Sequence, residues 1–324
     1  MIVKIVLILV LVVSVAVNVY LLLPNSPHIA DQVTQQRQVF RQTYPFLAGR
    51  IMAVDRKDRL INFVDLRKEL EKYSAKDEFR KGVFFEYLPS GVSIGIDDTL
   101  PFASASLLKV PLVMQIYKHI EDGSIKRTDI LEIRQQNIDR GFGTLWKRGI
   151  GTEITVAEAI KYALIESDNT AKSLLFGALP EGSIDEVFDA LDIPKELESD
   201  EAVISAFHYS SILRSLYLSS YLSPASSQEI LTLMSQSKYN DKLAAGVPKG
   251  TKVAHKIGVY ENDVDGNRET AEDDVTVYSD CGIIYAPNRP FMLCIFIQSP
   301  EEEARAFMKG AAEITYKYVH NANK

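Results

Sequence analysis

The sequence has few of the residues that bind metals. Its 324 residues include two cysteines and five histidines, and the histidines are scattered without the spacing of a metal site. Runs of positive charge are also missing, since no stretch of lysine and arginine reaches five residues and the formal net charge is −7. This charge balance argues against a nucleic-acid partner. We therefore expect no metal, no cofactor and no nucleic-acid partner.

Apolar residues are plentiful, at 46% of the chain beside 24% charged residues, which excludes wholesale disorder. The longest apolar stretch, residues 5–23, is interrupted only by Ser14 and Asn18 and is just long enough to cross a membrane as a helix. It lacks an Ala-x-Ala cleavage signal, which favours an uncleaved anchor over a cleaved signal peptide. Either would carry the rest of the chain across the membrane. The predicted divisions are an anchor or signal sequence over residues 1–24, a spacer over 25–60 and one domain over 61–324.

The two cysteines, Cys281 and Cys294, lie in two predicted strands joined by a turn centred on Pro287-Asn288. They would face each other across this hairpin, and an exported protein could oxidise them. Directly opposed Cβ atoms in a ladder usually lie farther apart than a disulfide requires. The sequence therefore favours two buried thiols over a disulfide.

Hydrophobic periodicity and turn signals give the order of the elements. Two strands are predicted around Pro89-Ser90-Gly91, followed by a helix buried on nearly all sides that runs to Asp122-Gly123 and bends at Pro111. An all-helical middle and a return to strands come next. The other predicted helices span 64–73, 155–165, 169–176, 184–191, 209–222, 227–234 and 300–320, and the C-terminal strands span 252–260, 275–285 and 290–298. This order predicts one domain whose sheet takes strands from both ends of the chain, with a helical subdomain inserted.

The first candidate catalytic pair is Ser106 and Lys109, at the start of the buried helix. The spacing places both side chains on one face, where burial would favour a neutral amine beside the hydroxyl. The alternative is a capping serine and a solvated lysine. Such pairs are common enough that the chain holds a second one, Ser235 and Lys238, which precedes no apolar helix and for which we adopt that alternative.

Two further motifs lie later in the sequence. Ser167-Asp168-Asn169 stands at a junction between predicted helices, where these residue types also serve as ordinary helix caps. Lys256 stands two residues before Gly258 on a predicted strand, where a glycine would let a ligand approach the backbone. Taken alone, this lysine would be an ordinary strand residue.

Together, and in this order, the three motifs form a more specific signature. From about Gly82 to its C-terminus the sequence resembles the class A β-lactamases and the D-alanyl-D-alanine peptidases related to them. The resemblance implies a β-lactamase/transpeptidase-like α+β fold. Such a fold has three α/β/α layers around an antiparallel sheet.

The resemblance also implies roles by position. Ser106 would be the acylated nucleophile and Lys109 its base, while Ser167 would pass a proton to the leaving nitrogen. Asn169 would hold the amide of the substrate side chain, and Lys256 would provide a positive charge toward Ser167 and the substrate carboxylate. The N–H groups of Ser106 and of Val259, beside Gly258, would form the oxyanion hole. Asp168 would fix the turn.

Two positions depart from the family pattern in the region that would bind a substrate carboxylate. Ile257 stands where relatives carry threonine or serine, so a hydroxyl is missing. The predicted strand over 275–285 has no arginine, which many relatives place there for the same carboxylate. His255 could compensate, although an ordinary strand residue is the simpler interpretation.

A third departure concerns deacylation. Class A β-lactamases use a glutamate in a Glu-x-x-Leu-Asn string to activate water, and this string is missing from the acidic segment that holds Glu196, Glu198 and Glu201. A solvated acidic turn is the plain interpretation of that segment. We therefore expect a long-lived acyl-enzyme.

These observations predict a monomeric serine hydrolase at the extracytoplasmic face of a bacterial cell membrane, or secreted if the N-terminus is cleaved. Its expected partner is a β-lactam or a peptidoglycan stem peptide. The alternatives are a peptidoglycan D,D-carboxypeptidase or transpeptidase, a sensor that is acylated without turnover, and an inactive scaffold.

Overall fold

The computed structural model describes residues 38–39, 42–47, 62–198, 201–261 and 276–321, without the side chains of 196–198 and 201. The chain divides into two units, residues 1–45 with 49–58, and residues 46–48 with 59–324. The predicted anchor over 1–24 and the predicted boundary at 60 lie outside the described residues. None of the helices in the described ranges has the length and apolar character needed to cross a membrane. The second unit contains every strand of these ranges.

A five-stranded sheet forms the centre of this second unit. Its strand order is β2-β1-β10-β9-β8, and every neighbouring pair is antiparallel. The strands are β1 (Arg80–Tyr87), β2 (Val92–Ile96), β8 (Val253–Glu261), β9 (Thr276–Ile284) and β10 (Phe291–Gln298). β1, near the start of the domain, pairs with β10, near its C-terminal end. The prediction that the sheet takes strands from both ends of the chain is confirmed.

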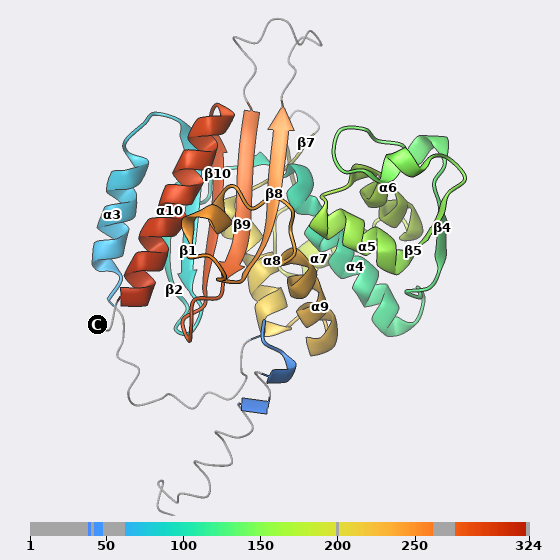
Figure 1. Ribbon diagram of the computed structural model, residues 1–324, viewed down its shortest axis with the longest axis horizontal. Helices are drawn as coiled ribbons and strands as arrows, with labels where there is room; N and C mark the ends of the chain where they lie inside the picture. The colour runs from blue at the N-terminus through green and yellow to red at the C-terminus, as the bar shows by residue number, and fades with distance from the viewer. Residues whose placement is uncertain (1–37, 40–41, 48–61, 199–200, 262–275, 322–324) are drawn as a thin grey trace, which may run out of the picture. The chain divides into compact units, whose positions relative to one another are not determined.

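Two helices cover one face of the sheet, α3 (Val64–Ser74) and α10 (Glu301–Asn321) (Figure 1). Alternate residues of the strands, such as Phe85 and Leu293, form with them a core of fully buried side chains. β10 is buried along almost its whole length because helices cover both of its faces.

The opposite face of the sheet carries the helical subdomain (Figure 1). α8 packs directly on β10, β1 and β9, and α9 packs on β8. The helices here are α4 (Lys109–Asp122), α5 (Val156–Ile165), α6 (Asn169–Ala178), α7 (Ser183–Ala190), α8 (Ala206–Leu218) and α9 (Pro224–Met234), and the 3₁₀ turns of the unit are η1 (Ala105–Leu108), η2 (Gln135–Asn137), η3 (Leu145–Arg148) and η4 (Leu243–Gly246). The three-layer α/β/α fold is the one that the family resemblance implied.

The middle of the chain is not all helical, which corrects the sequence prediction. β4 (Ile130–Glu132) pairs with β5 (Glu153–Thr155). β3 (Phe102–Ala103) pairs with β7 (Glu201–Ile204), which pairs with β6 (Glu196–Glu198). Strands of two to four residues are too short to show a period of two, so periodicity could not find them.

The residues that begin α5 and end α4 have the capping roles predicted from the sequence. Thr155 and Glu158 form the expected capping box of α5, and Gly123 ends α4 in the left-handed conformation. Pro111 lies in the first turn of α4, where the N–H that proline lacks has no partner within the helix. The position of this proline therefore does not by itself require the predicted bend.

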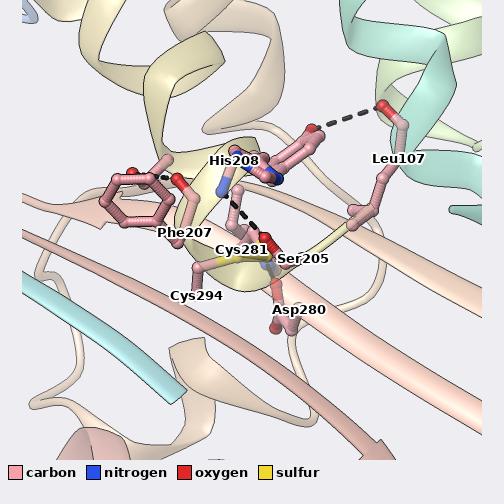
Figure 2. Close-up of a disulfide and its surroundings, with 10 residues drawn as sticks. Leu107, Ser205, Phe207, His208, Asp280, Cys281 and Cys294 are labelled. Atoms are coloured by element: carbon pink, nitrogen blue, oxygen red, sulfur yellow. Dashed lines mark hydrogen bonds and ion pairs between the residues drawn. A yellow bond between two sulfur atoms is a disulfide. The ribbon is translucent and has the colours of Figure 1, made fainter. Parts of the chain in front are cut away.

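The expectation of free thiols is wrong. Cys281 and Cys294 are directly paired across β9 and β10, as predicted, and their sulfur atoms are bonded in a buried disulfide (Figure 2). Their Cα atoms lie 3.9 Å apart, closer than the about 4.5–5.5 Å that is usual for directly opposed residues of an antiparallel ladder. α8 begins beside the disulfide, with Ser205 capping its first turn through the His208 N–H (Figure 2).

Candidate active site

Ser106 lies on η1, the 3₁₀ turn between β3 and α4, and not on α4 itself. The preceding residue, Ala105, has φ 45°, a left-handed conformation that a non-glycine residue adopts only when its surroundings hold it there. Ser104 supplies part of that support, because its N–H and its hydroxyl both donate to the Ala202 carbonyl on β7, at 2.9 and 2.6 Å. The short strands thus fix the entry to the nucleophile.

Lys109 begins α4 and reaches back over the same turn. Its Nζ donates to Ser106 Oγ at 2.6 Å and to Asn169 Oδ1 at 2.7 Å, and the residue is only 1% exposed. The pKa of Lys109 is lowered to about 7, mainly by burial and also by the charge of Lys172, against the opposing effects of Asp168 and Asp139. Near neutral pH, a large share of the molecules therefore holds a neutral amine against the Ser106 hydroxyl.

The motif Ser167-Asp168-Asn169 forms the turn between α5 and α6. Asp168 is fully buried and caps α6, with one carboxylate oxygen accepting from the Ala171 N–H at 2.8 Å. The other oxygen accepts from the Leu145 N–H at 2.7 Å. Asp168 therefore has the structural place expected of it, and the turn presents the two neighbouring side chains to the site.

A glycine makes this turn possible. Gly143 has φ +86°, and a Cβ built on it would lie 2.1 Å from the Asp168 Oδ2 atom. A side chain at this position would displace the carboxylate that organises the motif.

Lys256 extends from β8 onto the sheet face that carries the helical subdomain. Its Nζ donates to Ser167 Oγ at 2.7 Å and to the Ile257 carbonyl at 3.1 Å, and it is 1% exposed. Burial holds the pKa of Lys256 well below its ordinary value, with a further lowering by Lys109 and an opposing effect of Asp280. The site thus contains two serine–lysine pairs, each joined by a hydrogen bond.

Gly258 permits a close approach to the backbone of β8, and the atoms that make this approach belong to the protein itself. A Cβ at this position would lie 2.4 Å from Ser279 Oγ and 3.5 Å from the Ala105 Cβ and Leu107 Cγ atoms. The Leu107 carbonyl also accepts from the Tyr209 hydroxyl at 3.3 Å, which ties η1 to α8 (Figure 2). The glycine therefore lets the nucleophile turn pack onto β8, and it brings Ser106 close to the strand that carries Val259.

Ile257, which departs from the family pattern, and His255 beside Lys256 lie on the other face of β8. Val253 belongs to the core under α3 and α10, so alternation places His255 and Ile257 on that side and Lys256 on the opposite one. His255 is fully buried, with Nδ1 2.8 Å from Asp280 Oδ1 and Nε2 3.3 Å from Asn240 Oδ1. This histidine therefore cannot replace the missing carboxylate contact.

The second Ser-x-x-Lys pair behaves as an ordinary surface feature. Lys238 Nζ contacts Glu166 Oε1 at 2.8 Å, and Ser235 Oγ donates instead to the Thr232 carbonyl at 2.7 Å. The two members of this pair therefore serve different partners, and they provide matched controls for Ser106 and Lys109.

Sequence reasoning missed Asp139, which lies between η2 and η3. Its Oδ1 accepts from Asn169 Nδ2 at 3.2 Å and from the Gly141 N–H at 2.8 Å. Asp139 and Asn169 are 30 positions apart, so no local pattern could connect them.

The described residues contain no cluster of three or more His, Cys, Asp or Glu side chains that could hold a metal ion.

The three layers, with serine–lysine pairs where the helical subdomain meets the edge strand β8, define a β-lactamase-like serine hydrolase fold. A family model described as the beta-lactamase enzyme family matches residues 65–319, so the chain belongs to this family.

Solved structures agree with this fold. PBP-A has 19% sequence identity and a TM-score of 0.70, with 81% of this chain and 100% of that chain covered. A mutant of PBP-A in an acyl-enzyme complex with penicillin G has 20% identity, a TM-score of 0.69, and 79% and 97% coverage. A β-lactamase from Xanthomonas campestris has 22% identity, a TM-score of 0.67, and 80% and 99% coverage. A search of curated proteins found no significant match.

The two serine–lysine pairs lead to a prediction about pH. If neutral Lys109 is the base for Ser106, the second-order rate of acylation by a penicillin should rise with pH through about 7 and level off above it, because only the deprotonated amine can accept the proton. The measurement is adduct formation by mass spectrometry between about pH 5.5 and about pH 8.5, a range that brackets the pKa. A flat profile would show that Lys109 does not act by losing its proton in this range.

Proposed function

We propose that the protein is a serine hydrolase that transfers the acyl group of β-lactams or D-Ala-D-Ala peptides to Ser106 and releases it slowly. One observation carries the proposal. Lys109 Nζ lies 2.6 Å from Ser106 Oγ, and its pKa is lowered to about 7. An amine that is partly neutral beside a hydroxyl is a base beside a nucleophile.

In the proposed acylation, neutral Lys109 takes the hydroxyl proton while Ser106 Oγ bonds to the substrate carbonyl carbon. The N–H groups of Ser106 and Val259 would stabilise the negative oxygen that develops. As the carbon–nitrogen bond breaks, the Ser167 hydroxyl would donate its proton to the leaving nitrogen and recover one from Lys256. A bound substrate carboxylate would raise the pKa of Lys256 and so favour its charged form.

The slow release of the acyl group is proposed from the acidic segment that holds Glu196, Glu198 and Glu201. In the sequence this segment has no Glu-x-x-Leu-Asn string, and in the fold it contributes β6 and β7, which pair with each other, while β7 also pairs with β3. A mutant of PBP-A, a protein of similar fold, was solved as an acyl-enzyme complex with penicillin G, which supports the proposal that a penicillin acylates this chain. We propose that the active domain lies at the extracytoplasmic face of a membrane, because the apolar stretch over residues 5–23 would carry the rest of the chain across it.

The test is the intact mass of the protein over time with penicillin G. We expect an adduct of one penicillin that persists after the free antibiotic is removed, and none on Ser106→Ala. Ser235→Ala, in the second Ser-x-x-Lys pair, should form the adduct like the parent.

The other outcomes separate the alternatives. Consumption of penicillin without a lasting adduct would indicate a β-lactamase with a deacylating base. Release of D-alanine from a peptide ending in D-Ala-D-Ala would separate a peptidase from a sensor. No adduct and unchanged penicillin would contradict β-lactam acylation and leave an inactive scaffold.

A further inference from the structure

A carboxylate is fixed at the edge of the site, next to the side chain that would hold the substrate's amide. Asn169 is held from two sides, with Oδ1 accepting from Lys109 and Nδ2 donating to Asp139. This fixes the orientation of the amide, with its N–H side turned toward Asp139.

The position of Asp139 is itself built into the fold. Its N–H donates to Thr170 Oγ1 at 3.1 Å, and the Thr170 hydroxyl is 3.2 Å from the Asp139 carbonyl. Thr170 is fully buried at the start of α6, directly after Asn169. The aspartate and the asparagine are therefore fixed to the same turn of helix.

The carboxylate of Asp139 has capacity left for a ligand. Oδ1 accepts from Asn169 Nδ2 and from the Gly141 N–H, whereas none of the hydrogen bonds among the described residues reaches Oδ2 and none of their ion pairs includes Asp139. The neighbouring Arg140 places its guanidinium over the Trp146 ring, 5.4 Å from the ring centre. Asp139 is exposed, so its carboxylate can accept hydrogen bonds from a ligand at the edge of the site.

We propose that Asp139 selects acyl donors that carry a cationic amine next to the amide held by Asn169, an inference that rests on the proposed function. With the amide held by Asn169, a substituent on the carbon next to it would lie near Asn169 Nδ2, and Asp139 Oδ1 lies 3.2 Å from this atom. An ammonium group there would gain a charge-assisted hydrogen bond, and a carboxylate there would be repelled.

Three penicillins with one nucleus and one phenyl ring provide the test. They carry at the carbon next to the amide an amine (ampicillin), a hydrogen (penicillin G) or a carboxylate (carbenicillin). We expect acylation of the full-length parent in that order of rate, with about threefold between neighbours, because exposed ion pairs contribute modestly. Asp139→Asn should remove the order, and added salt should weaken it in the parent.

Two controls separate selection from general damage. Asp65→Asn removes the same charge on α3, at the opposite layer, and should keep the order. Equal losses with all three penicillins in Asp139→Asn, or no order in the parent, would overturn the proposal, because a residue that only positions Asn169 would affect all three alike.

Binding to Ser106→Ala, measured by calorimetry, keeps this inference distinct from the proposed function. Charge-ordered binding that Asp139→Asn abolishes, together with no adduct on the parent, would support selection by Asp139 while contradicting acylation. Binding without order, or no binding of any of the three penicillins, would overturn the inference.

Discussion

Lys109→Met should lose acylation of Ser106 almost completely while the protein stays folded. Removing a general base usually costs 10²- to 10⁴-fold, so we expect a decrease of about 10³-fold in the second-order rate with penicillin G. Methionine is unbranched and apolar, and it replaces a side chain that is 1% exposed at the start of an apolar helix. The rate of adduct formation and the thermal unfolding midpoint, measured together, separate chemistry from stability.

Lys238→Met is the matched control, because Lys238 belongs to the second Ser-x-x-Lys pair and its amine contacts Glu166 at the surface. We expect its acylation rate to stay within about threefold of the parent, as exposed ion pairs contribute little. If Lys109→Met acylates as fast as this control, another group takes the proton from Ser106.

Asp168→Ala should have the largest effect on stability. The buried carboxylate accepts from two backbone N–H groups, those of Ala171 and Leu145, and both would lose their partner. A buried donor left without a partner costs about 1–3 kcal/mol, so we expect the free energy of unfolding to fall by roughly 2–4 kcal/mol. Urea denaturation monitored by circular dichroism measures this loss.

Asp189→Ala provides a comparison, since this aspartate contacts Lys195 at the surface and is 66% exposed. Its loss should stay below about 1 kcal/mol. Asp168→Asn, which keeps one carbonyl acceptor, should fall between the two. A loss for Asp168→Ala no larger than for Asp189→Ala would mean that the two buried N–H groups find other partners.

The parts of the site that depend on short spacing could be predicted from the sequence. Ser106 and Lys109 lie three positions apart, and a helical or 3₁₀ turn brings such residues together whatever the rest of the fold does. The Thr155–Glu158 capping box has the same basis. Strand alternation could also have excluded His255, since adjacent strand residues point to opposite faces and Lys256 reaches the site.

The parts that depend on tertiary contact could not be predicted. The contact between Asp139 and Asn169 exists only because the loop and α6 pack together, as does the contact of Gly258 with the nucleophile turn. The cysteines show a different limit. Their pairing across the hairpin could be predicted from the turn, but whether they bond depended on a local approach of the two strands that no average spacing contains.

The pairing of β1 with β10 sets the order in which the molecule can fold. β1 ends at Tyr87, and its central neighbour β10 begins at Phe291, so a chain made from its N-terminus holds β1 without that neighbour for most of its synthesis. The sheet can close only after the last strand has formed, and contacts this distant in sequence form slowly. A newly made chain should therefore stay open until it is nearly complete, which would suit the proposed passage of the unfolded chain across a membrane.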